Sequence, residues 1–431
     1  MKKLILSFLP ITLLYALIVF VFGSSELSGD EHRYIKYATN LTQGYFVDPA
    51  NIDIRNGPMY SVLLAPFVAL GTPLWVPKLL NVVFLTGALI CIYLTLSKYT
   101  RPRVALISAY LMGLYPQSFK WVGRLYSDAF AFALICVCIF FFVRWVHAQE
   151  KEWKWGILAA VAFAFLALTK LIFAQVLTVC IVLSVLGLVI FRSHLAWKSL
   201  FSVLLAYVLC LPYLGYTYSI TDKFPLWGTN GGEQLYWMAS PYEGELGNWV
   251  DNASVLEKRI PELNPNHFDF YTSLEGMSGI DRNKAFLQKG VENLKAYPQN
   301  YLKHWIANMG RFFLNYPYSF KEQNMGTFAY MIPNMIVLLL VAFGSFVVFN
   351  TWKDVPTEFW LLLLFISIYI GGSSLVHAST RYFWMIIPVL TVWLGWIFGS
   401  KLKIQILRNS LIPTEGDDFV EEKLPVAEHI S

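Results

Sequence analysis

Long windows without Asp, Glu, Lys or Arg constrain this 431-residue chain more than any other feature. Such windows are rich in Leu, Ile, Val and Phe, and short polar connectors separate many of them. The windows are 4–25, 79–97, 104–119, 129–143, 155–169, 171–191, 199–221, 327–352, 359–376 and 382–400. Helices of this kind suit the ~30 Å apolar core of a bilayer. Because only 14% of all residues are charged, a disordered chain and an ordinary soluble enzyme are excluded. We predict an all-α polytopic membrane protein with about ten transmembrane helices.

The first window resembles a signal peptide in its position, directly after Lys2 and Lys3. Its apolar run is longer than the 7 to 15 residues of a typical signal sequence, so we expect an uncleaved first span. All five cysteines fall inside the apolar windows. We therefore expect them to be small core residues and not disulfide partners.

The basic connectors predict how the chain is oriented in the membrane. A further uncharged window, 56–77, is interrupted by several Gly and Pro residues, which disfavour a continuous span. If it does not cross, the basic connectors share one side with Lys2 and Lys3, as the positive-inside rule requires. The connectors are 98–103, 144–154, 191–198 and 401–408. We therefore predict that residues 57–71 form a re-entrant or interfacial helix.

This topology divides the chain into four parts. They are an N-terminal membrane module at 1–220 with a first outer loop at 24–78, a large outer loop with amphipathic helices at 221–326, C-terminal spans at 327–400 and a cytoplasmic tail at 401–431. The tail is acidic and polar, and we expect it to be disordered. In the large loop, apolar residues at helical spacing predict one helix over 281–313, lying on the membrane surface.

Charged residues gather where the predicted spans meet the outer face. Asp128 and Lys170 each lie at the end of a span. A charge at the centre of a span costs about 2.5 to 3.5 kcal/mol, so such groups are usually paired and in contact with water. Cations outnumber carboxylates on this face, which suits an anionic ligand such as a lipid phosphate. A transporter would be expected to place its charges near the midplane instead, and nucleic acid is not an expected ligand.

Several segments resemble the GT-C glycosyltransferases, in particular the protein O-mannosyltransferases and the aminoarabinose transferases of lipid A. The D-E-x-R-Y pattern at 30–34 follows the first span, as in those families. NGPMYSVLLAPFVALG at 56–71 resembles their juxtamembrane helix, although Asn56 stands where the family has a lysine and Arg55 precedes it. RLYSDAFAFAL at 124–134 resembles the start of the family's fourth span, which has an acidic residue, and FLALTKLIFA at 165–174 resembles the L-T-K or L-T-R turn between its fifth and sixth spans. The second outer loop at 228–247 and 281–302 and HASTRYFWMIIPVL at 377–390 follow in the same order.

The resemblance implies an integral membrane glycosyltransferase with a polyprenyl-phosphate sugar as donor. It implies that Asp30 is the base, with Glu31 and Asp128 as further catalytic residues that position it. The donor phosphate would be bound by Arg33, Arg55, Lys170 and Arg381, and other substrate groups by Tyr34, His377 and Tyr382. A divalent cation, Mg²⁺ or Mn²⁺, is a possible cofactor, with Asp30 and Asp128 as its ligands.

The predicted reaction follows from the charges. A sugar on a lipid phosphate already has a good leaving group, so only the attacking hydroxyl needs a base. The phosphate gains negative charge as the bond breaks, and cations held there stabilise the transition state. Direct attack predicts inversion at the anomeric carbon. The acceptor is a hydroxyl or phosphate on a glycan, a lipid or a protein, and the sugar is a hexose or a pentose.

We expect the active site to face the periplasm or cell exterior from a bacterial inner membrane. Two other functions fit the same residues. One is a polymerase or ligase of lipid-linked oligosaccharides, and the other is a transporter of lipid or sugar.

Overall fold

The computed structural model describes residues 2–24, 26–149, 151–320 and 324–402. In these ranges every regular element is a helix, and the predicted tail lies almost entirely outside them. The helices are α1 (Lys2–Phe22), α2 (Asp30–Thr42), α3 (Met59–Ala69), α4 (Trp75–Leu96), α5 (Pro102–Gly113), α6 (Pro116–Val122), α7 (Ser127–Val146), α8 (Trp153–Thr169), α9 (Ile172–Phe191), α10 (His194–Leu209), α11 (Leu211–Thr221), α12 (Gly231–Met238), α13 (Asn252–Leu256), η1 (Pro261–Leu263), η2 (Asn264–Phe268), α14 (Asp269–Ser273), α15 (Gly279–Ala296), α16 (Pro298–Leu314), α17 (Met325–Val348), η3 (Phe349–Asp354), α18 (Thr357–Val376) and α19 (Thr380–Ser400). The predicted all-α membrane fold is confirmed.

Seven helices in the described ranges are long and apolar enough to cross a membrane: α1, α4, α7, α9, α17, α18 and α19. The pair α10 and α11, bent by 40°, is an eighth if it acts as one span. The other two predicted windows form α5, with 12 residues, and α8, with 17. Helix α5 ends early because Tyr115 precedes Pro116 and is extended, as proline disfavours helical backbone in the residue before it.

Helix α3 occupies the segment that we predicted not to cross. Its eleven residues extend about 16 Å, roughly half of the apolar core of a bilayer. It packs against α2, with Tyr60 and Leu64 buried. Its length agrees with a re-entrant or interfacial helix.

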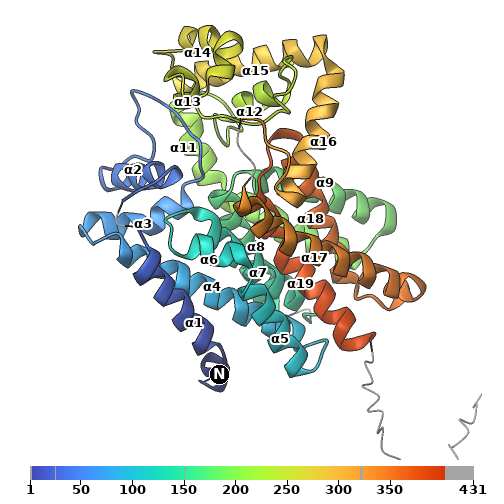
Figure 1. Cartoon of the computed structure of the whole chain (residues 1–431). Coiled ribbons are helices and arrows are strands. Elements are labelled where there is room, and N and C mark those ends of the chain that lie inside the picture. Colours follow the sequence, from blue (N-terminus) through green and yellow to red (C-terminus); the bar gives the residue numbers. More distant parts are fainter. Residues whose placement is uncertain (1, 25, 150, 321–323, 403–431) are drawn as a thin grey trace, which may run out of the picture.

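The long helices run alternately up and down, so their ends form two layers. The second-loop helices α12 to α15 gather at one end, which we call the loop end, and the N-terminus lies at the other, the connector end (Figure 1). At the connector end, Lys198 Nζ donates to the carbonyl oxygens of Val146 and Ala148, and His147 Nε2 lies 2.6 Å from Glu358 Oε1. The basic connectors 144–154 and 191–198 therefore meet on one side of the bundle.

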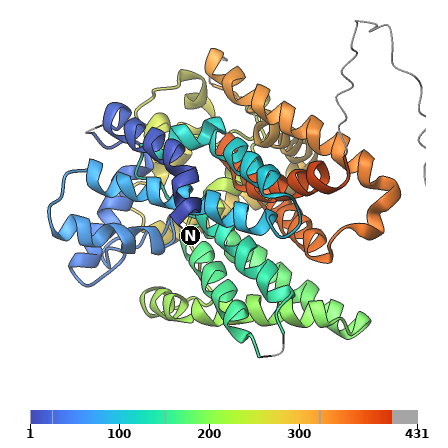
Figure 2. The same cartoon turned by 90° about the horizontal axis from the view of Figure 1, so that it is seen from below.

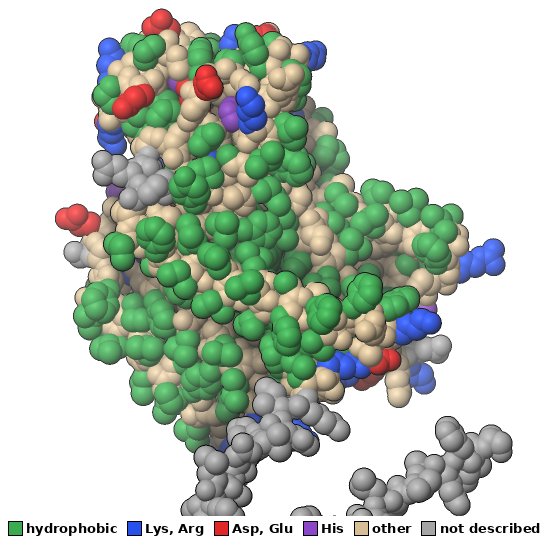
Figure 3. Space-filling model, turned by 45° about the vertical axis from the view of Figure 1, so that its right-hand side comes forward, with side chains coloured by type: hydrophobic (Ala, Val, Ile, Leu, Met, Phe, Trp, Pro, Cys, Tyr) green, Lys and Arg blue, Asp and Glu red, His purple; other side chains and the backbone are tan. Residues whose placement is uncertain are grey.

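Seen from below, the N-terminal helices in blue, the middle helices in green and the C-terminal helices in orange to red occupy different sides (Figure 2). A broad band of hydrophobic side chains covers the middle of the face in Figure 3, with charged side chains above and below it. Leu, Ile, Val and Phe residues on α1, α9 and α17 are exposed as well. Such a belt is what contact with lipid requires.

The second outer loop has a small core of its own. Its buried residues are Tyr236, Trp237, Val250, Val255, Leu263, Tyr271, Leu274 and Phe286. These rings contact one another, and Trp237 Nε1 donates to Tyr271 Oη at 2.9 Å. The loop is therefore a packed unit that can hold side chains at fixed positions above the membrane helices.

The predicted single helix over 281–313 was wrong, because the structure has two. Tyr297 is non-helical and Pro298 begins the next helix, α16. Part of the aromatic face of α16 contacts the protein itself. Trp305 Nε1 donates to Ser374 Oγ at 3.1 Å, so this face packs on the end of α18.

Candidate active site

Four helix ends meet at the loop end and bring charged side chains together. Asp30 begins α2, Asp128 is in the first turn of α7, Lys170 lies between α8 and α9, and Arg381 is in the first turn of α19. Lys170 Nζ is 2.9 Å from Asp128 Oδ1. Arg381 Nη1 is 3.3 Å from Asp30 Oδ2 and 3.9 Å from Asp128 Oδ2. Arg33 pairs with the other oxygen of Asp30. We call these five residues the ion cluster.

The ion cluster is deeply placed but open on one side. The side chains of Asp128 and Lys170 are 1% and 16% exposed, whereas those of Asp30, Arg381 and Arg33 are 24%, 25% and 30% exposed. Two carboxylates and three cations leave one positive charge in excess. A half-buried cluster with this balance favours a ligand with one negative charge.

Both carboxylate oxygens of Asp30 are held by arginines. Burial raises the pKa of Asp30, but the charges of Arg381, Arg33 and Lys170 outweigh it and lower this pKa below its ordinary value. Asp30 is therefore ionised at neutral pH. Among the carboxylates of the cluster it is also the more accessible to an incoming molecule.

A break in the helix presents Lys170 to the cluster. Helix α8 ends at Thr169. Lys170 then has an extended backbone, with φ −126° and ψ 102°, before α9 begins. The side chain of Lys170 reaches across to Asp128 at the start of α7. Asp128 Oδ2 receives no hydrogen bond in the described part of the chain, although it is buried. A buried oxygen of this kind normally has a partner, such as water or a ligand.

Glu31 does not join the ion pairs. It is 1% exposed, and its Oε1 accepts from the backbone N–H of Leu125 at 2.6 Å. Its Oε2 accepts from the backbone N–H of Ser28 at 2.8 Å. Glu31 thus ties the start of α2 to the turn before α7, and so fixes Asp30 relative to Asp128.

Tyr34 lies beside the ion cluster. Its hydroxyl lies 2.6 Å from Ser127 Oγ, next to Asp128, and accepts from Asn56 Nδ2 at 3.0 Å. The Tyr60 ring packs edge-on against it, 5.1 Å between centroids. Asn56, Tyr60 and Ser127 were not among the predicted site residues, and only the position of Ser127 beside Asp128 signals it in the sequence.

His377 and Tyr382 flank Arg381 on the other side. The Arg381 guanidinium lies 5.7 Å from the centroid of the Tyr382 ring, and the His377 ring is 5.8 Å from that ring. Burial, together with the positive charges of Arg381 and Arg311, lowers the pKa of His377 to about 3. The imidazole is therefore neutral at physiological pH.

Arg55 lies in a different network. Its Nη1 is 3.1 Å from Glu233 Oε2 and its Nε is 3.1 Å from Asp53 Oδ2, which also contacts Arg282 at 2.9 Å. These pairs join the first outer loop to the second. Arg55 was predicted to bind phosphate with the other cations, because the residues near it in sequence do not indicate a partner about 180 residues away. The structure does not bring it into the ion cluster.

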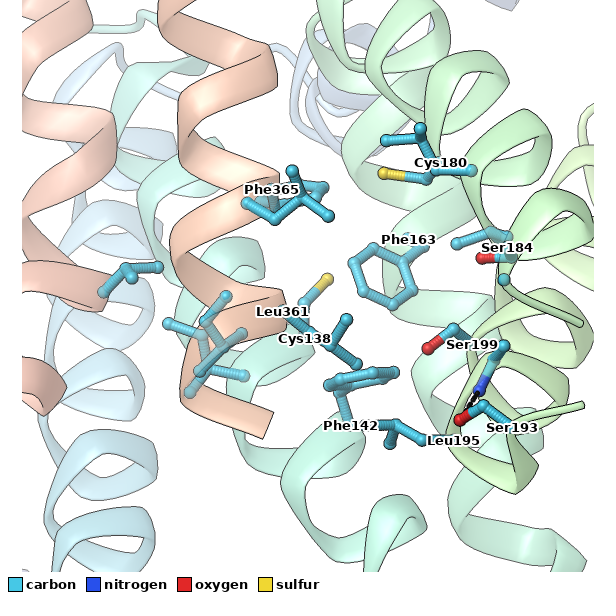
Figure 4. Close-up of a pocket in the computed structure, with 18 of the residues that line it drawn as sticks. Cys138, Phe142, Phe163, Cys180, Ser184, Ser193, Leu195, Ser199, Leu361 and Phe365 are labelled. Atoms are coloured by element: carbon cyan, nitrogen blue, oxygen red, sulfur yellow. Dashed lines mark hydrogen bonds between the residues drawn. The ribbon is translucent and has the colours of Figure 1, made fainter. Parts of the chain in front are cut away.

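An apolar cavity of about 250 Å³ lies lower in the bundle, between α7, α8, α9, α10 and α18 (Figure 4). Ile135, Cys138, Phe142, Phe163 and Phe365 are among its walls. On α7, Ile135 and Phe142 are seven and fourteen residues after Asp128, or about 10 and 21 Å along the axis. The cavity thus lies along the same helix as the ion cluster and reaches the connector end, where Ser193 and Leu195 line it.

The ion cluster does not fit a divalent cation. Arginines hold both oxygens of Asp30, and Lys170 holds one oxygen of Asp128. Three cations this close would repel a dication, which prefers several carboxylate or carbonyl oxygens. In the described residues, no three His, Cys, Asp or Glu side chains form a group that would hold a metal.

Comparison with known proteins gives one family and two structures. Residues 55–216 match the family of dolichyl-phosphate-mannose-protein mannosyltransferases. Crystal structures of ArnT from Cupriavidus metallidurans, bound to undecaprenyl phosphate and in the apo state, are both 13% identical. Their TM-scores are 0.42 and 0.40, with 91% of this chain and 77% of ArnT covered. No match is found among curated protein sequences. Over residues 55–216 this chain is thus similar to the dolichyl-phosphate-mannose-protein mannosyltransferases, which confirms the resemblance seen in the sequence.

Proposed function

We propose that this protein is an integral membrane glycosyltransferase that moves a hexose or pentose from a polyprenyl-phosphate donor to a hydroxyl or phosphate of an acceptor. The acceptor is a glycan, a lipid or a protein. The observation that carries the proposal is the half-buried ion cluster, which has one excess positive charge where four helix ends of the bundle meet. A sugar-bearing phosphodiester has one negative charge and lies at this depth in a bilayer.

The cations lower the barrier to cleavage of the bond between the sugar and the phosphate. When the sugar leaves, the phosphodiester becomes a monoester and gains negative charge. A phosphate bound in the ion cluster would have Arg33, Lys170 and Arg381 beside that oxygen, where they would stabilise the transition state more than the ground state. They are already positioned by Asp30 and Asp128, which reduces the cost of reorganisation during the reaction.

Asp30 accepts the proton of the acceptor hydroxyl. Its low pKa keeps it ionised, and its side chain is the more accessible carboxylate of the cluster. A bound phosphate shares Arg33 and Arg381 with Asp30, which raises the pKa of this carboxyl and makes it a stronger base. Attack from the side opposite the phosphate inverts the anomeric carbon. Because the cluster does not fit a dication, no metal takes part in this mechanism.

The donor lipid chain lies along the membrane helices below the cluster. The apolar cavity in Figure 4 receives its distal units, which are reached along α7 from Asp128. Helix α3, next to α2, lies at the entry for the lipid. The loop end faces the periplasm or cell exterior of a bacterial inner membrane, because the basic connectors 144–154 and 191–198 share the opposite end.

The test is an Asp30→Asn variant in cells that otherwise lack the gene. Mass spectrometry of cell-envelope glycans, lipid A and lipid-linked sugars identifies the missing product and the accumulating donor. Wild type restores the product, and Asp30→Asn reduces its rate of formation by about 10² to 10⁴, the usual contribution of a general base. Asp269→Asn, which alters an exposed carboxylate in the second loop, serves as the matched control.

Two outcomes contradict the proposal. A folded Asp30→Asn variant with normal product excludes Asp30 as the base, and sugar or lipid flux that survives this change indicates a transporter.

The same transfer assay with added EDTA should keep its rate, since the mechanism requires no metal.

A further inference from the structure

Three aromatic rings contact one another between the second outer loop and α19. The Trp249 and His377 rings are 6.1 Å apart between centroids and inclined at 59°. The His377 and Tyr382 rings are 5.8 Å apart and inclined at 84°. Trp249 comes from the second loop, whereas the other two flank the turn between α18 and α19. We call these three residues the aromatic wall.

The aromatic wall adjoins the ion cluster. Arg381, which lies over the Tyr382 ring, also donates to Asp30 Oδ2. A molecule bound at Asp30 and Arg381 therefore has the wall directly beside it. A membrane-interface belt is the ordinary reason for outer aromatic residues, but belt residues face lipid. These rings instead face one another and the half-buried Arg381.

The wall also has polar edges that no described residue hydrogen-bonds. The indole N–H of Trp249 and the ring nitrogens of His377 make no hydrogen bond with any residue that the structure describes. His377 is neutral, because its pKa is about 3, so one of its nitrogens donates and the other accepts. Aromatic faces with a few free donors and acceptors are typical of small-molecule sites.

The backbone that carries Trp249 is braced. Buried Arg311 donates to the carbonyl oxygen of Leu246 at 2.9 Å and lies 3.4 Å from that of Gly247. Asn248 Nδ2 donates to the carbonyl oxygen of Ser319 at 3.1 Å. Gly247 has a φ of +62°, and a Cβ there would lie 2.8 Å from His304 Cβ. The segment is thus fixed in position beside the α18–α19 turn.

We infer that Trp249, His377 and Tyr382 form a binding site for a sugar ring, built jointly by the second outer loop and the α18–α19 turn. A sugar ring has an apolar C–H face that packs on aromatic rings, and hydroxyl groups at its rim that pair with free N–H and N groups. This inference rests on the proposed function and deepens it by giving the sugar a place in the site. The sugar belongs either to the donor or to a glycan acceptor.

Binding is measured without any transfer step. The full-length protein in lipid nanodiscs is mixed with millimolar methyl glycosides of glucose, mannose, galactose, N-acetylglucosamine and arabinose, and saturation-transfer NMR detects the bound ones. We expect at least one glycoside to bind, with its signal reduced about fivefold or more in Trp249→Ala and largely kept in Trp249→Phe. Trp75→Ala removes a 47% exposed tryptophan at the start of α4 and should leave the signal unchanged.

The inference is overturned if no glycoside binds to wild type, or if folded Trp249→Ala binds as well as wild type. When a glycoside binds, the source of the sugar is assigned by adding the same sugar linked to polyprenyl phosphate. Displacement of the free glycoside identifies the donor sugar, and its retention identifies a glycan acceptor. The Asp30→Asn variant should lose transfer but still bind the glycoside, whereas Trp249→Ala should lose glycoside binding. The two proposals can therefore fail separately.

Discussion

Lys170 and Asp128 form the most buried ion pair of the cluster, with side chains 16% and 1% exposed. Removing one partner of a buried pair leaves an uncompensated charge and costs about 3 to 5 kcal/mol, more than the pair itself contributes. We therefore expect Lys170→Met to lower the stability of the folded protein by about that amount. Thermal unfolding in detergent micelles measures this loss.

The double variant Lys170→Met, Asp128→Asn separates stability from function. It removes both charges, so we expect it to regain much of the stability that the single variant loses. It should still lack transfer, because one of the three phosphate-binding cations is missing. Equal stability of wild type and the Lys170→Met variant would show that the pair is far more hydrated than its burial indicates.

His377 makes the stability of the protein sensitive to acid. Its pKa falls from 6.5 to about 3 on folding, so between these values the unfolded chain binds a proton that the native state does not. The stabilising contribution is therefore complete above pH 6.5 and is lost as the pH falls toward 3. We expect the melting temperature to fall less between pH 7 and pH 5 in His377→Gln than in wild type. Parallel slopes for the two proteins would mean that His377 is protonated in the native state.

At the scale of elements, Glu31 joins α2 to the turn before α7. Its two oxygens accept from the backbone N–H groups of Leu125 and Ser28. Glu31→Gln keeps the shape but replaces one acceptor oxygen by an NH₂ group, which cannot accept from either N–H. We expect a tenfold or larger loss of transfer, because Asp30 moves relative to Asp128, and a loss of about 1 to 3 kcal/mol in stability.

The control for this prediction is Glu292→Gln on α15, where Glu292 is 53% exposed and 3.7 Å from Lys289. Transfer rate and unfolding are measured for both variants. If Glu31→Gln transfers sugar at the wild-type rate, the junction between α2 and α7 does not position Asp30.

Local chemistry sets the ends of several elements, although the predictions over 104–119 and 281–313 each continued across a proline that begins a new helix. Pro116 and Pro298 begin α6 and α16, and Lys170 follows α8 directly. The direction of the aromatic face of α16 was not predictable. It depends on a hydrogen bond from Trp305 to Ser374, about 70 residues away, and periodicity alone cannot distinguish a protein partner from a lipid surface.

At the scale of the whole molecule, alternation of the spans explains why the predicted charges meet. Any residue at the outer end of a span lies in the same layer as the others, so Asp30, Asp128, Lys170 and Arg381 could be assigned to one face from sequence. Sequence does not say which residues within that layer touch. Arg55 is in the right layer, yet Glu233 from the second loop engages it.

The same alternation predicts that the loop end and the connector end of the bundle lie on opposite sides of the membrane. Glu243 in the second loop and Lys151 in the connector after α7 are both exposed. Cysteines placed at these positions should react differently with a membrane-impermeable maleimide added to intact spheroplasts. Glu243→Cys should be labelled at once, and Lys151→Cys only after the membrane is permeabilised. The native cysteines are buried or half-buried, so the unaltered chain gives the background. Labelling of both variants in intact spheroplasts would place the connector end outside as well, and labelling of Lys151→Cys alone would turn the ion cluster toward the cytoplasm. In the second case the positive-inside rule fails for this chain, and a donor presented at the outer leaflet would not reach Asp30.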